Sequence, residues 1–218
     1  MSTPKTWGGR SAVERRTERR QRLITAALEI WRENGWPAVT IRAVCARTSL
    51  NDRYFYETFT DRDELLGAAW ETVRDDMLEA LATAFEDNLD RPLPEIVRIA
   101  ATVVTDRMSA DPAYSRILLL HHAGSPALEA CRVNAMRLTA GLVVAGALRV
   151  LGPTADERAL HMDAIIGVGG FVELITAWQS GLLDCTATEI VDHTVRLVST
   201  FSLDHADAFA RREAAVDK

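Results

Sequence analysis

Residues 40–56 read TIRAVCARTSLNDRYFY, and this stretch decides the fold of the first third of the chain. Thr40 and Asn51 are good helix N-caps, because their side-chain oxygens accept the free amide hydrogens of a first helical turn. These caps predict a helix over 41–47, a tight turn, and a second short helix that begins at Asp52. Two short helices joined in this way form a helix-turn-helix.

The second helix of such a motif lies in the major groove of DNA and presents its N-terminal residues to base edges. Arg53 can fork onto guanine, and tyrosines offer hydroxyls to phosphates and rings to thymine methyls. Phe55 and Phe59 should point into the small core, and a core-only three-helix unit that touches no DNA remains the alternative. The motif predicts double-stranded DNA as a partner. The residues that face it are Asn51, Asp52, Arg53, Tyr54 and Tyr56.

Charge divides the chain of 218 residues. Residues 1–62 hold 12 Lys+Arg and 7 Asp+Glu, whereas residues 63–218 hold 13 and 24. A basic first third suits a polyanion, so we expect a DNA-binding domain over 1–62 and a second helical domain over 63–218. The N-terminal arm can follow phosphates or enter a minor groove, or it can be a solubilising tail with only Arg20 and Arg22 near DNA. Its arginines are Arg10, Arg15, Arg16, Arg19, Arg20 and Arg22.

Helical periodicity runs through the whole chain, and neither an alternating strand nor a repeat of fixed period is evident. A capping box at Ser11 and a stop at Gly35 bound the first helix. Asp61 opens a long fourth helix through an Asp-based variant of the capping box. We therefore predict an all-α fold of about nine helices. The later ones span about 61–85, 94–108, 112–122, 126–151, 155–180 and 188–210.

The stretch 22–66 resembles the DNA-binding domain of TetR-type (tetracycline-repressor-like) regulators. The later segment 169–183, GGFVELITAWQSGLL, is similar to the penultimate, dimer-forming helix of that family. The resemblance implies a sequence-specific DNA-binding regulator with a variable ligand-binding domain. The shared positions are Ile24, Ala26, Ala27, Gly35, Trp36, Thr40, Ile41, Val44, Leu50, Tyr56, Phe59 and Arg62–Leu66.

The resemblance also implies roles for single residues. Thr40, Tyr56 and Arg62 should bind phosphate, and Arg42 should contact a base. The positions of Asp52, Arg53 and Tyr54 are the variable base readers of the family. The chain departs from the family pattern at the turn, where Ser49 replaces a glycine and must accept a strained backbone. It departs again at Thr58, which replaces a histidine, and Glu57 and Asp52 add negative charge near DNA.

Such proteins dimerise on palindromic sites, because one helix-turn-helix reads few base pairs. Two apolar helix faces can form a four-helix bundle between subunits, or can be core within one subunit. The first face holds Phe171, Leu174, Ile175 and Trp178, and the second holds Val191, Val195 and Val198.

A pocket for a small-molecule effector should lie among the helices between Leu65 and Trp178. Candidate lining residues can equally be plain core. They are Trp70, Met108, Leu119, His122, Met136 and Phe171.

Other functions find little support in the sequence. His121 and His122 point about 100° apart on a helix, so they do not share a metal site. No serine sits in a nucleophile elbow, so we expect no catalytic residue, no metal and no cofactor. The longest uncharged run, 117–128, is too short to span a bilayer, and the N-terminus lacks a signal-peptide core, which favours the cytoplasm. The expected function is a ligand-responsive homodimeric repressor; the alternative is a helical enzyme or interaction module with a vestigial helix-turn-helix.

Overall fold

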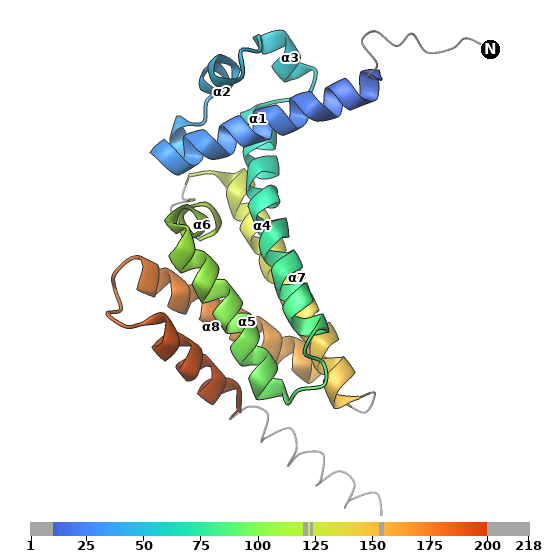
Figure 1. Ribbon diagram of the computed structural model, residues 1–218, viewed down its shortest axis with the longest axis vertical. Helices are drawn as coiled ribbons and strands as arrows, with labels where there is room; N and C mark the ends of the chain where they lie inside the picture. Colours follow the sequence, from blue (N-terminus) through green and yellow to red (C-terminus); the bar gives the residue numbers. More distant parts are fainter. Residues whose placement is uncertain (1–10, 120–121, 123, 153–154, 200–218) are drawn as a thin grey trace, which may run out of the picture. The chain divides into compact units, whose positions relative to one another are not determined.

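The computed structural model describes residues 11–119, 122, 124–152 and 155–199 (Figure 1). These residues form helices and no strand, which confirms the predicted all-α class. A helix over 187–199 follows the last labelled one. The labelled elements are α1 (Ala12–Asn34), the 3-10 turn η1 (Trp36–Ala38), α2 (Ile41–Thr48), α3 (Asp52–Tyr56), α4 (Arg62–Glu86), α5 (Leu93–Ala110), α6 (Pro112–Leu118), α7 (Pro126–Leu151) and α8 (Glu157–Gln179).

The chain packs as two compact units. The first contains the residues up to Arg74 together with Arg116–Arg132, and the second contains Asp75–Ser115 and the residues from Val133 onward. The segment 116–132 is therefore part of the unit that holds the helix-turn-helix, although it is far from it in sequence. The predicted boundary between a DNA-binding domain over 1–62 and a second helical domain over 63–218 stays a prediction.

The helices of the first unit begin and end where local chemistry directs them. Ser11 accepts the amide hydrogen of Glu14, and the Glu14 carboxylate accepts the amide hydrogen of Ser11, which completes the predicted capping box. Gly35 ends α1 with a φ of 80°, a conformation that glycine adopts without steric cost. Thr40 and Asn51 cap α2 and α3 by accepting from the amides of Ala43 and Tyr54, each at 3.1 Å.

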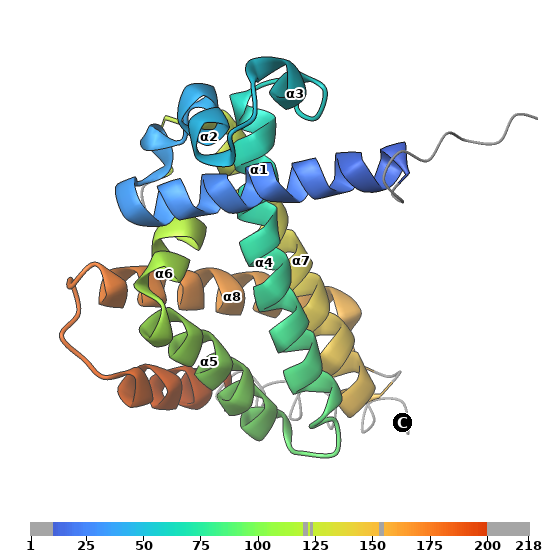
Figure 2. The same ribbon diagram turned by 45° about the horizontal axis from the view of Figure 1, so that its top comes forward.

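The turn between α2 and α3 contains the departure expected from the sequence. Ser49 has a φ of 55° and a ψ of 32°, which is left-handed backbone, and it is the non-glycine residue with positive φ in the described chain. Both ribbon views show α2 and α3 on the same side of α1 (Figures 1 and 2). Their inner faces close a core whose members are at most 5% exposed: Leu23, Ile24, Ala27, Trp31, Val44, Cys45, Phe55 and Phe59.

Two helix ends differ from the prediction. Helix α6 ends at Leu118 and not at His122, because His122 leaves the helical path and is buried against the rings of Trp31 and Trp70. Its Nε2 lies 2.6 Å from the carbonyl oxygen of Ile117; a carbonyl only accepts, so Nε2 carries the proton. Asp61 caps α4 by accepting the amide hydrogen of Glu64, but the Glu64 carboxylate accepts from the amide of Thr60 and not from that of Asp61. Residues 200–210 of the last predicted helix lie outside the described residues.

In the second unit, α7 and α8 pack through a small apolar cluster of Ala140, Val144, Ala147, Leu160 and Ala164. The ring of Phe85 on α4 packs against Gly146, where a Cβ would stand 3.0 Å from it. By length and composition α7 and α8 are apolar enough to cross a membrane, yet only 17% and 11% of their apolar windows is buried. Buried core helices of soluble proteins pass the same test, but these two leave much of their apolar surface uncovered.

Candidate nucleic-acid interface

Helix α3 presents its polar side chains outward on a rigid base. The side chain of Arg53 is 83% exposed, and Tyr54 and Tyr56 are 40% and 59% exposed. Between them Phe55 is fully buried and contacts the rings of Tyr56 and Phe59. One face of this short helix therefore anchors it in the core, and the other offers hydrogen-bonding groups to an outside partner.

The flanking positions are also accessible. Thr40, Arg42, Asn51 and Asp52 are all exposed. The hydroxyl oxygen of Thr40 and the side-chain oxygen of Asn51 accept backbone amides as caps. Burial and the neighbouring Asp52 carboxylate raise the pKa of the Cys45 thiol, so this cysteine is held in its neutral form beneath the surface.

The N-terminal half of α1 is helical from Ala12, so residues 12–22 are not a loose tail; Arg10 lies outside the described residues. Arg16, Arg20 and Leu23 follow one another along α1 at spacings of four and three residues. The two arginines therefore lie on the same helix face as the buried residues Leu23 and Ala27. The N-terminal part of this helix face, at Arg16 and Arg20, is basic, whereas the part at Leu23 and Ala27 is apolar. The guanidinium of Arg20 stacks on the Phe59 ring at 4.5 Å from its centroid.

A single carboxylate connects α1 with α3. Arg53 donates through Nε to Oε1 of Glu57 at 3.1 Å, and Arg19 Nη2 lies 3.8 Å from Oε2 of the same residue. The Arg19 guanidinium also stands 5.3 Å from the centroid of the Tyr54 ring. Glu57 thus holds one arginine with each oxygen, an arrangement that the sequence did not reveal.

Two arginines of this unit hold the backbone of the domain itself. Arg22 donates to the carbonyl oxygen of Thr48 at 2.7 Å, at the C-terminal end of α2. Arg62, predicted from the resemblance to bind phosphate, donates to the carbonyls of Val39 and Trp36 at 2.5 and 2.8 Å. Its guanidinium also stacks on the Trp36 ring, so its structural role is plain and a phosphate contact stays a prediction.

A third arginine is neutralised by carboxylates. Arg47 on α2 makes a fork to both oxygens of Glu33 at 2.8 and 2.7 Å, and it lies 3.6 Å from Glu29. This hydrogen bond lowers the pKa of the Glu33 carboxyl. Arg47 therefore fastens α2 to α1 and contributes little net positive charge to the surface.

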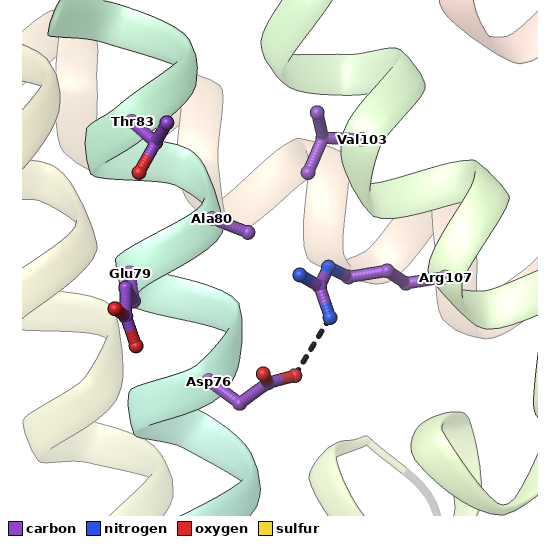
Figure 3. A pocket seen from close by; sticks show the side chains of 6 residues that line it. All are labelled: Asp76, Glu79, Ala80, Thr83, Val103 and Arg107. Carbon is purple, nitrogen blue, oxygen red and sulfur yellow. Dashed lines mark hydrogen bonds and ion pairs between the residues drawn. The ribbon is translucent and has the colours of Figure 1, made fainter.

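The second unit contains a cavity of about 490 Å³ between α4 and α5 (Figure 3). An ion pair at 2.7 Å between Arg107 and Asp76 crosses one end of it, and the carboxylate of Glu79 adds a second negative charge. Ala80, Thr83 and Val103 complete the wall.

The six residues predicted to line an effector pocket do not line this cavity. Trp70, Leu119 and His122 belong to the unit of the helix-turn-helix, where Trp70 and His122 are core. Met108, Met136 and Phe171 belong to the second unit, and Met108 is buried. That any of them contacts a ligand remains a prediction.

The predicted dimer faces are partly used inside the subunit. Ile175 and Val191 are 1% and 5% exposed, so they are core and offer no surface to a partner. The other predicted members, Phe171, Leu174, Trp178, Val195 and Val198, are half-buried. Indole Nε1 of Trp178 donates to the carbonyl oxygen of Cys185. The strongly exposed apolar residues of α8 are instead Met162, Ile165 and Ile166, at 53%, 60% and 61%.

The described residues do not gather the side chains that a metal ion needs. No set of three or more His, Cys, Asp or Glu side chains comes together there. The chemistry that this surface offers is hydrogen bonding and positive charge on a short helix.

Comparison with known proteins gives this geometry a context. Residues 23–69 match the family model described as bacterial regulatory proteins, tetR family. No curated protein sequence matched the chain.

Three solved structures illustrate the similarity of fold. A TetR-family transcriptional regulator from Pectobacterium atrosepticum has a TM-score of 0.65 at 18% identity, covering 88% of this chain and 95% of that one. The fatty acid degradation regulator FadR from Bacillus halodurans scores 0.62 at 14% identity, with coverages of 82% and 93%. The multidrug binding protein EbrR, complexed with imidazole, scores 0.61 at 17% identity, with coverages of 82% and 94%. Residues 23–69 therefore match the model of the tetR family of bacterial regulatory proteins, and the described residues share their fold with solved TetR-family transcriptional regulators.

Proposed function

We propose that this protein is a sequence-specific transcriptional regulator that binds an operator in double-stranded DNA. The observation that carries the proposal is α3, which exposes Arg53, Tyr54 and Tyr56 while Phe55 fixes it to the core. A helix held in this way can enter a major groove as a rigid body. Arg53 offers a fork to guanine, and the tyrosine hydroxyls offer donors to phosphates.

Asp52 and Glu57 on the same surface support a specific partner and not any polyanion. Negative charge near phosphates weakens binding that depends on charge alone. Arg20 and Arg42 supply exposed positive charge on α1 and α2, beside the recognition helix. The balance favours recognition through base edges, with backbone contacts for position.

The regulator acts as a homodimer in this proposal, on a palindromic operator. The face of α8 that holds Met162, Ile165 and Ile166 is apolar and unpartnered within the described chain. Gly170 continues this face, and no atom of the described chain lies within 4 Å of where its Cβ would stand, so a second helix could approach closely there. A self-complementary helix face of this kind suits a twofold interface.

A small-molecule effector would control DNA binding, most simply as an inducer of a repressor that acts in the cytoplasm. The α4–α5 cavity offers a volume suited to a small organic molecule, with two carboxylates and one guanidinium to orient it. A coupling free energy of about 1–3 kcal/mol between the effector and DNA sites would change operator affinity about 5- to 150-fold.

The decisive experiment measures binding to the DNA upstream of the protein's own gene by fluorescence anisotropy at several salt concentrations. We expect saturable binding that weakens steeply with salt, and a selected sequence with twofold symmetry. Arg53→Ala should cost about 1–3 kcal/mol at one base position of each half-site. If neither this DNA nor any member of a randomised duplex library is bound in preference to the rest, the proposal is wrong.

A further inference from the structure

We propose that Glu57 is a specificity-determining residue, which positions Arg53 for a base and holds Arg19 against the same helix. The inference rests on the proposed DNA-binding function and names a residue that acts through another. It starts from the two oxygens of one exposed carboxylate, which hold arginines from two helices.

The atom that Glu57 contacts on Arg53 decides what the rest of that side chain can do. The contact is made to Nε, at 3.1 Å. A guanidinium presents a second edge, formed by its two terminal nitrogens, and a guanine base accepts on that edge through O6 and N7. Glu57 therefore binds Arg53 through Nε and leaves the two terminal nitrogens of the guanidinium to donate to DNA.

The contact with Glu57 matters because it orients an exposed side chain that could otherwise rotate. The Arg53 side chain is 83% exposed, and among the described residues only Glu57 holds it by a hydrogen bond or an ion pair. A long, exposed side chain loses rotational entropy when it docks on a base, and a fork that is already oriented loses less. Preorganisation by Glu57 would strengthen the correct base contact relative to contacts with other sequences.

Helix stability does not account for the pair. An exposed i,i+4 ion pair contributes little to folding. With the arginine N-terminal to the glutamate, this pair also has the less favourable orientation relative to the helix dipole. Its effect is therefore expected in DNA binding and not in the stability of the domain.

The second arginine extends the role of Glu57 beyond α3. Arg19 lies 3.8 Å from Oε2 of Glu57, and its guanidinium is near the ring of Tyr54. Its side chain is only 24% exposed, so it is held between α1 and α3. Glu57 thereby keeps Arg19 on the protein, and its negative charge opposes phosphates that approach without a matching base contact.

Two substitutions separate positioning from charge. Glu57→Asp keeps the charge, but its carboxylate is one methylene shorter and should not reach Nε of Arg53. Glu57→Gln removes the charge. Glu33→Gln is the matched control, because it removes one negative charge from an arginine-bound glutamate of the same unit without touching α3.

The assay uses the full-length protein and the duplex that the wild type selects from a randomised library. Dissociation constants are measured for that duplex, for each of its single-base variants, and for an unrelated duplex of equal length. We expect Glu57→Asp to lose about tenfold in discrimination at the base position that Arg53→Ala identifies, and Glu57→Gln, whose amide oxygen still reaches Nε, to lose less. Glu57→Gln should also bind the unrelated duplex about three- to tenfold more tightly, with a salt slope steeper by up to about one. Glu33→Gln should keep the wild-type discrimination.

A double-mutant cycle tests whether Glu57 acts through Arg53. In the Arg53→Ala background, Glu57→Asp should change discrimination at that position by less than about twofold. The inference is overturned if Glu57→Asp discriminates like the wild type, or if Glu33→Gln loses as much as Glu57→Gln. A wild type that selects no sequence would overturn the proposed function as well, so the two failures are distinguishable.

Discussion

Replacement of Arg62 by alanine tests the structural role that the fold assigns to this residue. Its guanidinium donates to the carbonyls of Val39 and Trp36, and it stacks on the Trp36 ring at 5.2 Å from the centroid. These contacts fasten the start of α4 to the segment between α1 and α2. We expect Arg62→Ala to destabilise the helix-turn-helix unit, because it leaves these carbonyls without their charged donor.

The magnitude follows from the number and kind of contacts. A hydrogen bond to a charged group contributes about 1.5–3 kcal/mol, and a cation–π contact contributes about 0.5–1 kcal/mol at an exposed site. Water can replace part of the lost bonding, because the Arg62 side chain is only half-buried. We therefore expect a loss of about 2–4 kcal/mol, which is a large fraction of a typical unfolding free energy of about 5–15 kcal/mol.

Urea denaturation followed by circular dichroism measures this loss. Arg42→Ala is the control, because it removes an exposed arginine of the same unit and should change the unfolding free energy by less than about 0.5 kcal/mol. Arg62→Lys keeps the charge without the fork, so it should recover less than half of the loss. An Arg62→Ala protein as stable as the wild type would show that the contacts to Val39 and Trp36 do not hold the domain together.

Three further results are expected. Ser49→Val should lower the unfolding free energy by about 1–3 kcal/mol in urea denaturation, because a β-branched residue is strained at a φ of 55°, whereas Ser49→Gly should not lower it. Ile166→Glu should shift the protein from dimer to monomer in sedimentation velocity, and Thr83→Glu, which adds the same charge on α4, should leave the dimer intact; a dimeric Ile166→Glu protein would contradict the α8 interface. The pair of Glu33 with Arg47 lowers the pKa of Glu33 below its ordinary 4.5, so its contribution is present above that pH and lost as the pH falls through the lowered folded-state pKa. The stability difference between wild type and Glu33→Gln should therefore be present near pH 7 and disappear as the pH falls through the lowered pKa of Glu33; a difference that persists in strong acid would exclude this ion pair as its source.

Caps made the helix-turn-helix predictable from sequence. The oxygens of Ser11, Thr40 and Asn51 act on amides three residues ahead, so the information lies within a few residues and needs no tertiary context. Proline and glycine were similarly informative, and α7 begins at Pro126 and ends at Leu151 as predicted. The turn residue Ser49 was correctly singled out as the position where left-handed backbone would be required.

Long-range partners were the part that the sequence could not supply. The carbonyls that Arg62 binds lie 23 and 26 residues away in sequence. No local sequence pattern distinguishes an arginine that binds such carbonyls from one that binds phosphate. The end of α6 depended on His122 finding Trp31 and Trp70, which come from α1 and α4. On α8 the sequence correctly indicated an apolar helix face. Which part of that face stays exposed depends on the helices packed against it, and this information is not local. Ile175 was therefore assigned to an interface, although it is buried in the core.

The same distinction changes how the charge of the DNA-binding unit should be read. An excess of basic residues over 1–62 predicts attraction to a polyanion. The arginines differ, however, in whether their guanidinium groups are available to bind it. Arg22 and Arg62 hold backbone carbonyls, and Arg47 is paired with carboxylates. Arg20, Arg42 and Arg53 remain exposed, and of these Arg53 is aimed by Glu57. A count of charges therefore overstates the number of phosphate contacts, and the affinity of such a surface for DNA must depend on where a few oriented groups meet the bases.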